Sequence, residues 1–169
     1  MQTNDQTKIT TAQKITPFLW YDNNAEEAVN FYTLIFKNSS IGKIARYSAE
    51  SAKVSGQKEG SAMTVPFTLE GQKFTAINGG PIFKFTEAVS FVVGCDNQEE
   101  IDHFWNKFTE EGKESQCGWL KDKYGLSWQV IPKQLGQIMS GPNGGKVMGA
   151  MLKMKKIIIK DLEQAANNP

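Results

Sequence analysis

The sequence predicts an α+β fold of two paired βαβββ-type modules that form a curved mixed sheet, followed by a C-terminal helix. Strand-like and helix-like patterns alternate along the chain, and the same order of elements occurs twice. We expect a disordered polar lead over residues 1–13, a first module over 14–87, a second module over 88–145, and a C-terminal helix and tail over 146–169. All of them are expected to form one structural domain.

Composition places the chain among ordinary globular proteins. Hydrophobic residues make up 40% of its 169 residues, and the net charge of +1 argues against nucleic-acid binding. No apolar run reaches the roughly 18 residues of a membrane helix, and the polar start lacks the apolar core of a signal peptide. Cys95 and Cys117 form no CxxC pair, so free thiols in a reducing cytoplasm are expected.

The first module begins with an aromatic strand ending at Tyr21, and Pro17 predicts that this strand starts near Phe18 at a sheet edge, because proline lacks an N–H donor. Asp22-Asn23-Asn24 is typical of a helix start and precedes an apolar stripe at helical spacing. The sequence then predicts a helix over residues 25–36, a polar loop over 49–60 and a tight turn at Glu70-Gly71. Strands are predicted over 41–47, 63–69 and 74–77, the second of them interrupted by Pro66.

The second module repeats this order. A strand over 89–93 and the capping pair Asp96-Asn97 precede an amphipathic helix that we expect Gly112 to end with a positive φ. Two strands are predicted over 116–120 and 126–131, joined by a turn at residues 122–125, and a short helical turn over 135–139. From Lys146 one longer helix is expected, with Met148, Met151, Leu152, Ile158 and Leu162 on its apolar face.

The repeat has a constant offset of 73 residues over the two helices, from Phe31-Tyr32 to Phe104-Trp105. The same offset aligns Phe18-Leu19 with Phe91-Val92, and Gly71-x-x-Phe74 aligns with Gly125-x-x-Trp128 at an offset of 54. Chance similarity of two amphipathic α/β units is the alternative explanation. If the halves are true repeats, a ligand cleft between them is expected.

The chain also resembles a known family. The resemblance rests on the run from Cys117 to Pro132, on Pro17 to Tyr21, on Phe74 to Gly80, on Ala88 to Phe91 and on Val147 to Ile157. These segments are similar to the PhnB-like proteins, also labelled 3-demethylubiquinone-9 3-methyltransferase-like, of the vicinal oxygen chelate superfamily that includes glyoxalase I and bleomycin-resistance proteins. The resemblance spans about residues 14–166 and implies paired βαβββ modules, a homodimer and a pocket in each cupped sheet.

The candidate ligand-binding residues lie on strands and strand ends near the predicted cup. They are Trp20, Asn78, Ser90, Cys117 and Trp128, with Phe85 and Trp119 as further aromatic candidates. Core packing is the alternative for each aromatic residue, and a buried inert thiol is the alternative for Cys117. The turn at Asp122 is expected to be structural.

No metal site or cofactor is predicted. Metal-dependent relatives place ligands on the first strand of each module, where this sequence has Phe18 to Trp20 and Ser90, and its one histidine, His103, lies on a helix. Both strand-to-helix turns are rich in Asp and Asn instead of forming the glycine-rich turn of a nucleotide cradle. No catalytic residue is assigned.

Three functional hypotheses follow. The first is a metal-free protein that binds an apolar or aromatic small molecule in the cup. The second is an enzyme, either a metal-assisted isomerase or lyase of the superfamily or a methyltransferase as the family label suggests. The third is an interaction protein whose terminal helix closes a homodimer. A small-molecule ligand is the expected partner, with no nucleic acid and no membrane.

Overall fold

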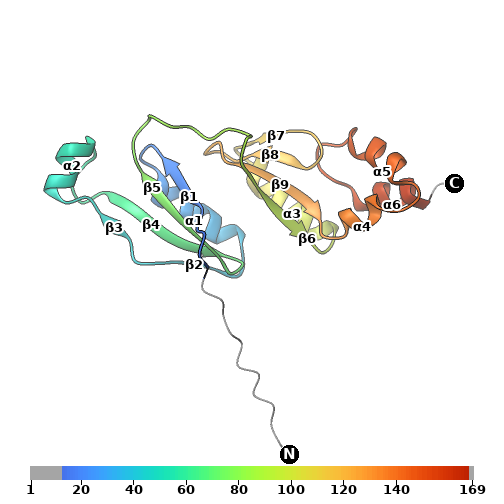
Figure 1. The fold of residues 1–169 in the computed structure, drawn as a ribbon, viewed down its shortest axis with the longest axis horizontal. Coiled ribbons are helices and arrows are strands. Elements are labelled where there is room, and N and C mark those ends of the chain that lie inside the picture. Colours follow the sequence, from blue (N-terminus) through green and yellow to red (C-terminus); the bar gives the residue numbers. More distant parts are fainter. Residues whose placement is uncertain (1–12, 168–169) are drawn as a thin grey trace, which may run out of the picture. The chain divides into compact units, whose positions relative to one another are not determined.

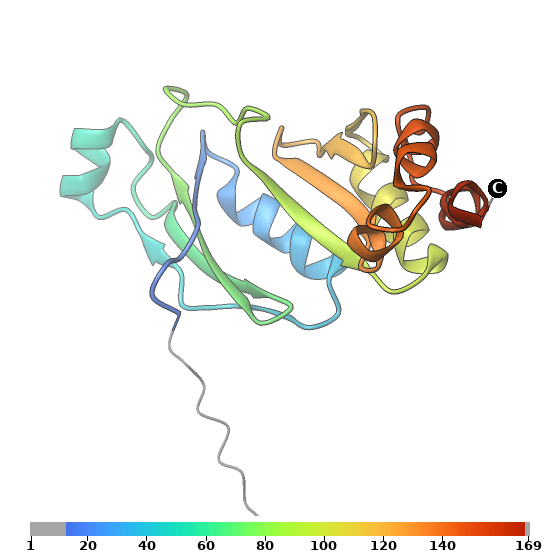
Figure 2. The ribbon, with the colours of Figure 1, turned by 45° about the vertical axis from the view of Figure 1, so that its right-hand side comes forward.

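The structure of the protein, a computed structural model, describes residues 13–167 (Figure 1). The predicted polar lead lies outside this range except for its last residue. The chain divides into two compact units, one ending at Phe83 and the other beginning at Lys84. Each unit has a mixed sheet with one long helix beside it (Figures 1 and 2), which agrees with the predicted α+β class. No helix within residues 13–167 has the length and apolar character needed to cross a membrane.

The first unit is built on one mixed sheet. Its strands follow the order β1-β5-β4-β2, with β3 also paired to β4. β1 runs parallel to β5, and the other pairs are antiparallel. β1 ends this strand order and starts at Phe18, as Pro17 predicts. The elements are β1 (Phe18–Tyr21), α1 (Ala25–Ile35), β2 (Ser39–Ile41), β3 (Ala45–Arg46), α2 (Ala49–Ser55), β4 (Ala62–Leu69) and β5 (Gln72–Asn78).

The second unit repeats this topology and adds three helices. Its strand order is β6-β9-β8-β7, and β6 runs parallel to β9. In both units the first strand in sequence pairs with the last strand. The last strand then pairs with the penultimate strand, which in turn pairs with the second strand. The shared strand order confirms the repeat. The elements are β6 (Ser90–Cys95), α3 (Gln98–Thr109), β7 (Lys113–Glu114), β8 (Trp119–Lys121), β9 (Ser127–Pro132), α4 (Leu135–Met139), α5 (Gly144–Met151) and α6 (Ile159–Asn167).

The predicted offset holds for the helices but not for the first strands. Buried Tyr32 on α1 corresponds to buried Trp105 on α3 at the offset of 73. On the strands, Leu19 is buried whereas its predicted equivalent Val92 is 57% exposed. The buried equivalent is Val93, one residue further along. The turn before α3 is one residue shorter than the turn before α1, and a one-residue shift moves a strand residue to the other face.

The single strand predicted over residues 41–47 is two short strands. β2 pairs with β4 up to Phe67, and β3 resumes the pairing at Thr64. Between them Pro66 of β4 accepts a hydrogen bond from the Gly42 amide at 2.7 Å. Because proline has no N–H to return, the ladder is interrupted at this point. The interruption predicted at Pro66 therefore divides the partner strand, whereas β4 itself is continuous.

The polar loop predicted over residues 49–60 contains a helix, α2. Ser48 and Ser51 form a reciprocal capping box at its start, and Gly56 ends it with φ +71°. The sequence signal was present as Ser48-x-x-Ser51, but the short, polar helix lacks the apolar stripe by which the other helices were recognised. The turn at Glu70-Gly71 is confirmed, with positive φ at both residues as a two-residue hairpin requires.

The prediction that Gly112 ends α3 with a positive φ was wrong. The helix ends at Thr109, and Gly112 does not have a positive φ. A Cβ atom at Gly112 would lie 2.3 Å from the carbonyl oxygens of Phe108 and Lys121. The glycine is therefore needed for close approach to β8, where the chain forms the unpredicted strand β7.

The single C-terminal helix predicted from Lys146 is two helices, α5 and α6, separated by residues 152–158. The carbonyl groups of Met154 and Lys155 in this connecting segment accept hydrogen bonds from the Cys117 and Gly118 amides, at 2.8 and 2.7 Å. Ile157 is fully buried. The backbone groups of the segment are thus paired with the loop before β8, so a continuous helix does not form.

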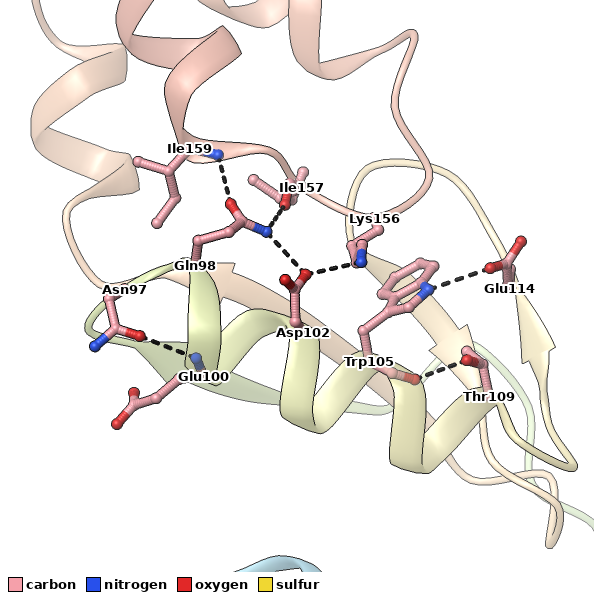
Figure 3. A network of polar contacts seen from close by, with 10 residues as sticks. All are labelled: Asn97, Gln98, Glu100, Asp102, Trp105, Thr109, Glu114, Lys156, Ile157 and Ile159. Carbon is pink, nitrogen blue, oxygen red and sulfur yellow. Dashed lines mark hydrogen bonds and ion pairs between the residues drawn. The ribbon is translucent and has the colours of Figure 1, made fainter.

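A polar network joins the same segment to α3 (Figure 3). The side-chain Nε2 of Gln98 donates to Asp102 Oδ1 and to the Ile157 carbonyl, both at 3.1 Å. Its Oε1 accepts from the backbone amide of Ile159 at 2.9 Å. Lys156 pairs with Asp102 at 2.7 Å. The side chain of Gln98 therefore fixes both the end of the connecting segment and the start of α6.

Acid should weaken this attachment. A hydrogen bond from Lys156, which has the larger effect, and a second from Gln98 lower the pKa of Asp102 below its ordinary 3.8. The contribution of Asp102 to stability is therefore complete above pH 3.8 and is lost as pH falls through the lower folded pKa. We expect the unfolding midpoint of Asp102→Asn to fall less than that of the wild type between pH 6 and pH 2.5. The difference should correspond to roughly 0.5 kcal/mol, because the pair is partly exposed.

The exposed, uncharged Leu34 on α1 supplies the control for this thermal unfolding series. Leu34→Ala removes no titratable group and should retain the acid sensitivity of the wild type. Equal acid sensitivity in Asp102→Asn and the wild type would show that the Asp102 pair does not stabilise the folded state.

Candidate functional site

The first sheet has one face against α1 and an opposite face that we call the first open face. The Tyr21 hydroxyl lies 3.1 Å from the Tyr32 hydroxyl of α1, and Phe67 stacks on Tyr32, so these strand residues face the helix. Because side chains alternate along a strand, the neighbouring residues face the other way. The first open face consists of Phe18, Trp20, Thr64, Pro66, Thr68, Thr75 and Ile77.

Trp20 is held firmly on the first open face. Its indole N–H donates to the Gly80 carbonyl at 2.9 Å, and Phe83 packs edge-on against it with ring centroids 5.0 Å apart. A Cβ atom at Gly79 would lie 2.1 Å from the indole, so only glycine allows this approach. The ring is half-buried and provides a fixed aromatic surface on the same face as Thr64, Thr68 and Thr75.

Asn78 is occupied by structural hydrogen bonds. It is 4% exposed, its Oδ1 accepts from the Ala25 amide at 2.8 Å, and its Nδ2 donates to the Ala62 carbonyl at 2.9 Å. The Tyr47 hydroxyl donates to its backbone carbonyl. Asn78 therefore satisfies the first turn of α1 and joins it to β4, and we leave it out of the ligand site proposed below.

Trp128 likewise faces a helix. It is 3% exposed and stacks on Phe108 of α3 with ring centroids 4.6 Å apart. Its indole N–H donates to Asp122 Oδ2 at 2.9 Å, while Asp122 Oδ1 accepts from the Tyr124 and Leu126 amides. Asp122 thus holds the turn before β9, in agreement with its predicted structural role. We place Trp128 in the core of the second unit and not in the ligand site.

The opposite face of the second sheet, the second open face, carries residues that the sequence analysis largely missed. Ser90 lies on this face, and its hydroxyl accepts a hydrogen bond from the side-chain Nε2 of Gln129 at 2.9 Å. The signal was the alternation about Trp128, because a helix-facing Trp128 places residues 127 and 129 on the opposite face. The second open face consists of Ser90, Val92, Trp119, Lys121, Ser127, Gln129 and Ile131.

The two cysteines occupy different environments. Cys95 is fully buried on β6, and burial raises the pKa of its thiol to about 12. Cys117 is half-buried in the loop before β8, with φ +60°, and its Sγ lies 3.6 Å from the Met151 carbonyl of α5. The structure therefore places Cys117 beside α5, and its ligand-binding role remains a prediction.

The side chains of residues 13–167 provide no group of three or more His, Cys, Asp and Glu arranged to hold a metal ion. The side-chain oxygen and nitrogen atoms of the open faces belong to hydroxyl, amide, ammonium and indole groups. His103 is exposed on α3, and Phe85 is half-buried in the segment before β6.

Residues 13–131 match the family of 3-demethylubiquinone-9 3-methyltransferase. The chain belongs to this family. It is thereby PhnB-like, as the sequence resemblance predicted. A comparison with curated proteins gives no match.

Solved structures agree with this membership. The PhnB protein of Bacillus cereus is 40% identical, with a TM-score of 0.63 over 70% of this chain and 99% of that chain. Protein PA1353 of Pseudomonas aeruginosa is 18% identical, with a TM-score of 0.59 over 72% and 98%, and shows the fold alone. The family match ends at Ile131, so α4, α5 and α6 lie beyond it, as do the matches predicted from Val147 to Ile157.

Placing a methyl group at Gly79 should displace Trp20. In Gly79→Ala the new Cβ would overlap the indole, so the ring must move and its hydrogen bond to Gly80 must break. We expect a shift in tryptophan fluorescence and a loss of stability of about 1–3 kcal/mol, the usual range for overpacking. Gly136→Ala, whose Cβ meets no atom within 4 Å, is the control. It should leave the fluorescence unchanged and should not lower stability, because alanine is favoured over glycine within a helix such as α4. An unchanged spectrum in Gly79→Ala would contradict the described position of Trp20.

The two thiols should differ in reactivity. With its pKa raised to about 12, Cys95 forms almost no thiolate at pH 8, and it is out of contact with solvent. We expect iodoacetamide to modify the native protein at Cys117 alone, with Cys95 reacting only after denaturation. Mass spectrometry of native and unfolded samples measures this, with Cys117→Ser as the control. Labelling of Cys95 in the native protein would contradict its described burial.

Proposed function

We propose that this protein binds an apolar or aromatic small molecule on the open faces of its sheets, without a metal ion. The observation that carries the proposal is the chemistry of those faces. Trp20 and Trp119 are half-buried, Phe18 is 58% exposed and Val92 is 57% exposed. Hydroxyl and amide groups lie between these apolar side chains. Such a mixture of aromatic surface and a few polar groups is typical of small-molecule sites.

The donor set of the open faces does not fit the divalent ion of metal-dependent relatives. A divalent ion in a catalytic site needs several imidazole or carboxylate ligands that converge on it. At the positions where those relatives place ligands, this chain has Phe18 to Trp20 and Ser90, and the Ser90 hydroxyl is bonded to Gln129. We therefore derive no reaction step through a metal.

The proposal also departs from the family's name, which describes a methyl transfer. A nucleotide-type cofactor is usually bound at a glycine-rich turn between a strand and a helix. Here the turn before α3 is used as a cap, since Asn97 Oδ1 accepts from the Glu100 amide at 2.9 Å. The corresponding turn before α1 is joined to β5 by Asn78.

A homodimer in the cytoplasm belongs to the same proposal. The family resemblance implies the dimer. Val147 of α5 is buried, whereas Met148 of α5 and Leu152, the residue that caps the end of this helix, are 42% and 61% exposed. Methionine and leucine at the surface of α5 suit contact with a second subunit, because methionine adapts to irregular apolar surfaces.

A thermal-shift series tests the proposed binding. We expect naphthalene and phenyl compounds to raise the unfolding temperature, because a ligand that binds only the folded state stabilises it. Manganese, zinc and magnesium ions should not. Trp20→Ala should weaken binding of an aromatic compound at least about tenfold, because a large aromatic contact is removed. Leu34→Ala, at an 86% exposed position on α1, is the control and should bind as the wild type does.

The opposite pattern would exclude the proposal. Stabilisation by divalent ions alone, or saturable binding of S-adenosylmethionine in the absence of any aromatic hit, would favour an enzyme of the superfamily instead.

A further inference from the structure

Ser127 is a buried polar group without a partner. It begins β9, is 1% exposed, and its Oγ is the one buried side-chain oxygen or nitrogen within residues 13–167 that has no hydrogen bond. Buried hydroxyl groups in folded proteins are nearly always bonded, because leaving one unpaired costs free energy. An unpaired Oγ therefore points to a group that the folded chain does not itself supply.

The residues around Ser127 indicate the chemistry of the external group that its hydroxyl would bind. In the strand register, Ser127 lies between Ser90 of β6 and Lys121 of β8. The Ser90 hydroxyl is bonded to Gln129, whereas the Lys121 ammonium pairs with the Glu87 carboxylate at 2.6 Å. Glu87 is exposed and precedes β6, so a carboxylate already reaches this end of the second open face from the solvent side.

Two residues further along the three strands, the second open face has apolar side chains on both sides of Gln129. Val92 and Trp119 flank Gln129 in the register, and two residues along a strand span about 6.6 Å. A molecule that places an anionic oxygen at Ser127 and Lys121 would therefore extend its body over Val92 and Trp119. The spacing suits one or two fused rings.

We propose that the second open face binds an aromatic carboxylate. The Ser127 hydroxyl donates to the carboxylate, which replaces Glu87 as the partner of Lys121, and the rings lie over Val92 and Trp119. The exchange of Glu87 for the ligand opens the approach to Ser127. This inference rests on the proposed function and adds to it the chemical class of the ligand.

Paired probes test this inference with the full-length protein. We expect calorimetric titration to show that 2-naphthoate binds about tenfold or more tightly than the neutral 2-naphthalenemethanol, because hydrogen bonds to charged groups are the stronger ones. Ser127→Ala should remove most of this preference. It should not lower the unfolding temperature, because it deletes a hydroxyl without a partner.

Two further variants separate the roles. Glu87→Gln should strengthen 2-naphthoate binding several-fold, because the internal competitor for Lys121 is lost. Ser115→Ala, at an exposed position in the loop before β8, is the matched control and should leave the preference unchanged.

The failures are distinguishable. Equal affinity for the two probes, an unchanged preference in Ser127→Ala, or a lowered unfolding temperature in that variant would overturn the assignment of Ser127 while leaving small-molecule binding intact. Absence of binding by both probes and by every aromatic compound of the thermal-shift series would overturn the proposed function as well.

Discussion

Both units depend on the parallel pairing of their first strand with their last. β1 pairs with β5 and β6 pairs with β9, so the chain must return across one face of the sheet between them. The long helix that follows the first strand packs on that face and buries residues such as Tyr32 and Trp105. One face of each sheet is thereby committed to the core, and the opposite face is the one on which we propose that a ligand binds.

The buried polar groups separate into structural and unsatisfied ones. Asn78 and Asp122 are both nearly inaccessible, and in each a side-chain oxygen, Oδ1, accepts hydrogen bonds from the backbone. The other Asp122 oxygen accepts from the Trp128 indole. These two residues determine where α1 starts and how the turn before β9 is shaped. Ser127 is equally buried but unpaired. The contrast matters because burial alone does not indicate function, whereas burial without a partner calls for an external one.

The three C-terminal helices extend the second unit beyond the part shared with the family. Their attachment uses backbone hydrogen bonds to the loop before β8, the Gln98 network on α3 (Figure 3) and the buried Ile157. Glu114 takes part from β7, since its carboxylate accepts from the Trp105 indole at 3.2 Å and pairs with Lys155. The loop that carries Cys117 is thus held between the sheet and this extension.

The sequence by itself determined the class of fold, the repeat, most strand and helix positions and the family. Alternation, Asx caps and apolar stripes are local, and the sequence displays them directly. It indicated an interruption at Pro66 but not that the break falls on the partner strand, between β2 and β3. It also did not determine the division of the C-terminal helix at residues 152–158. Both features result from pairing with distant segments. The candidate site shows the same division. Trp20 and Ser90 lie on open faces as their positions suggested, whereas Trp128 faces α3, because only the strand register decides which of two adjacent residues meets the helix.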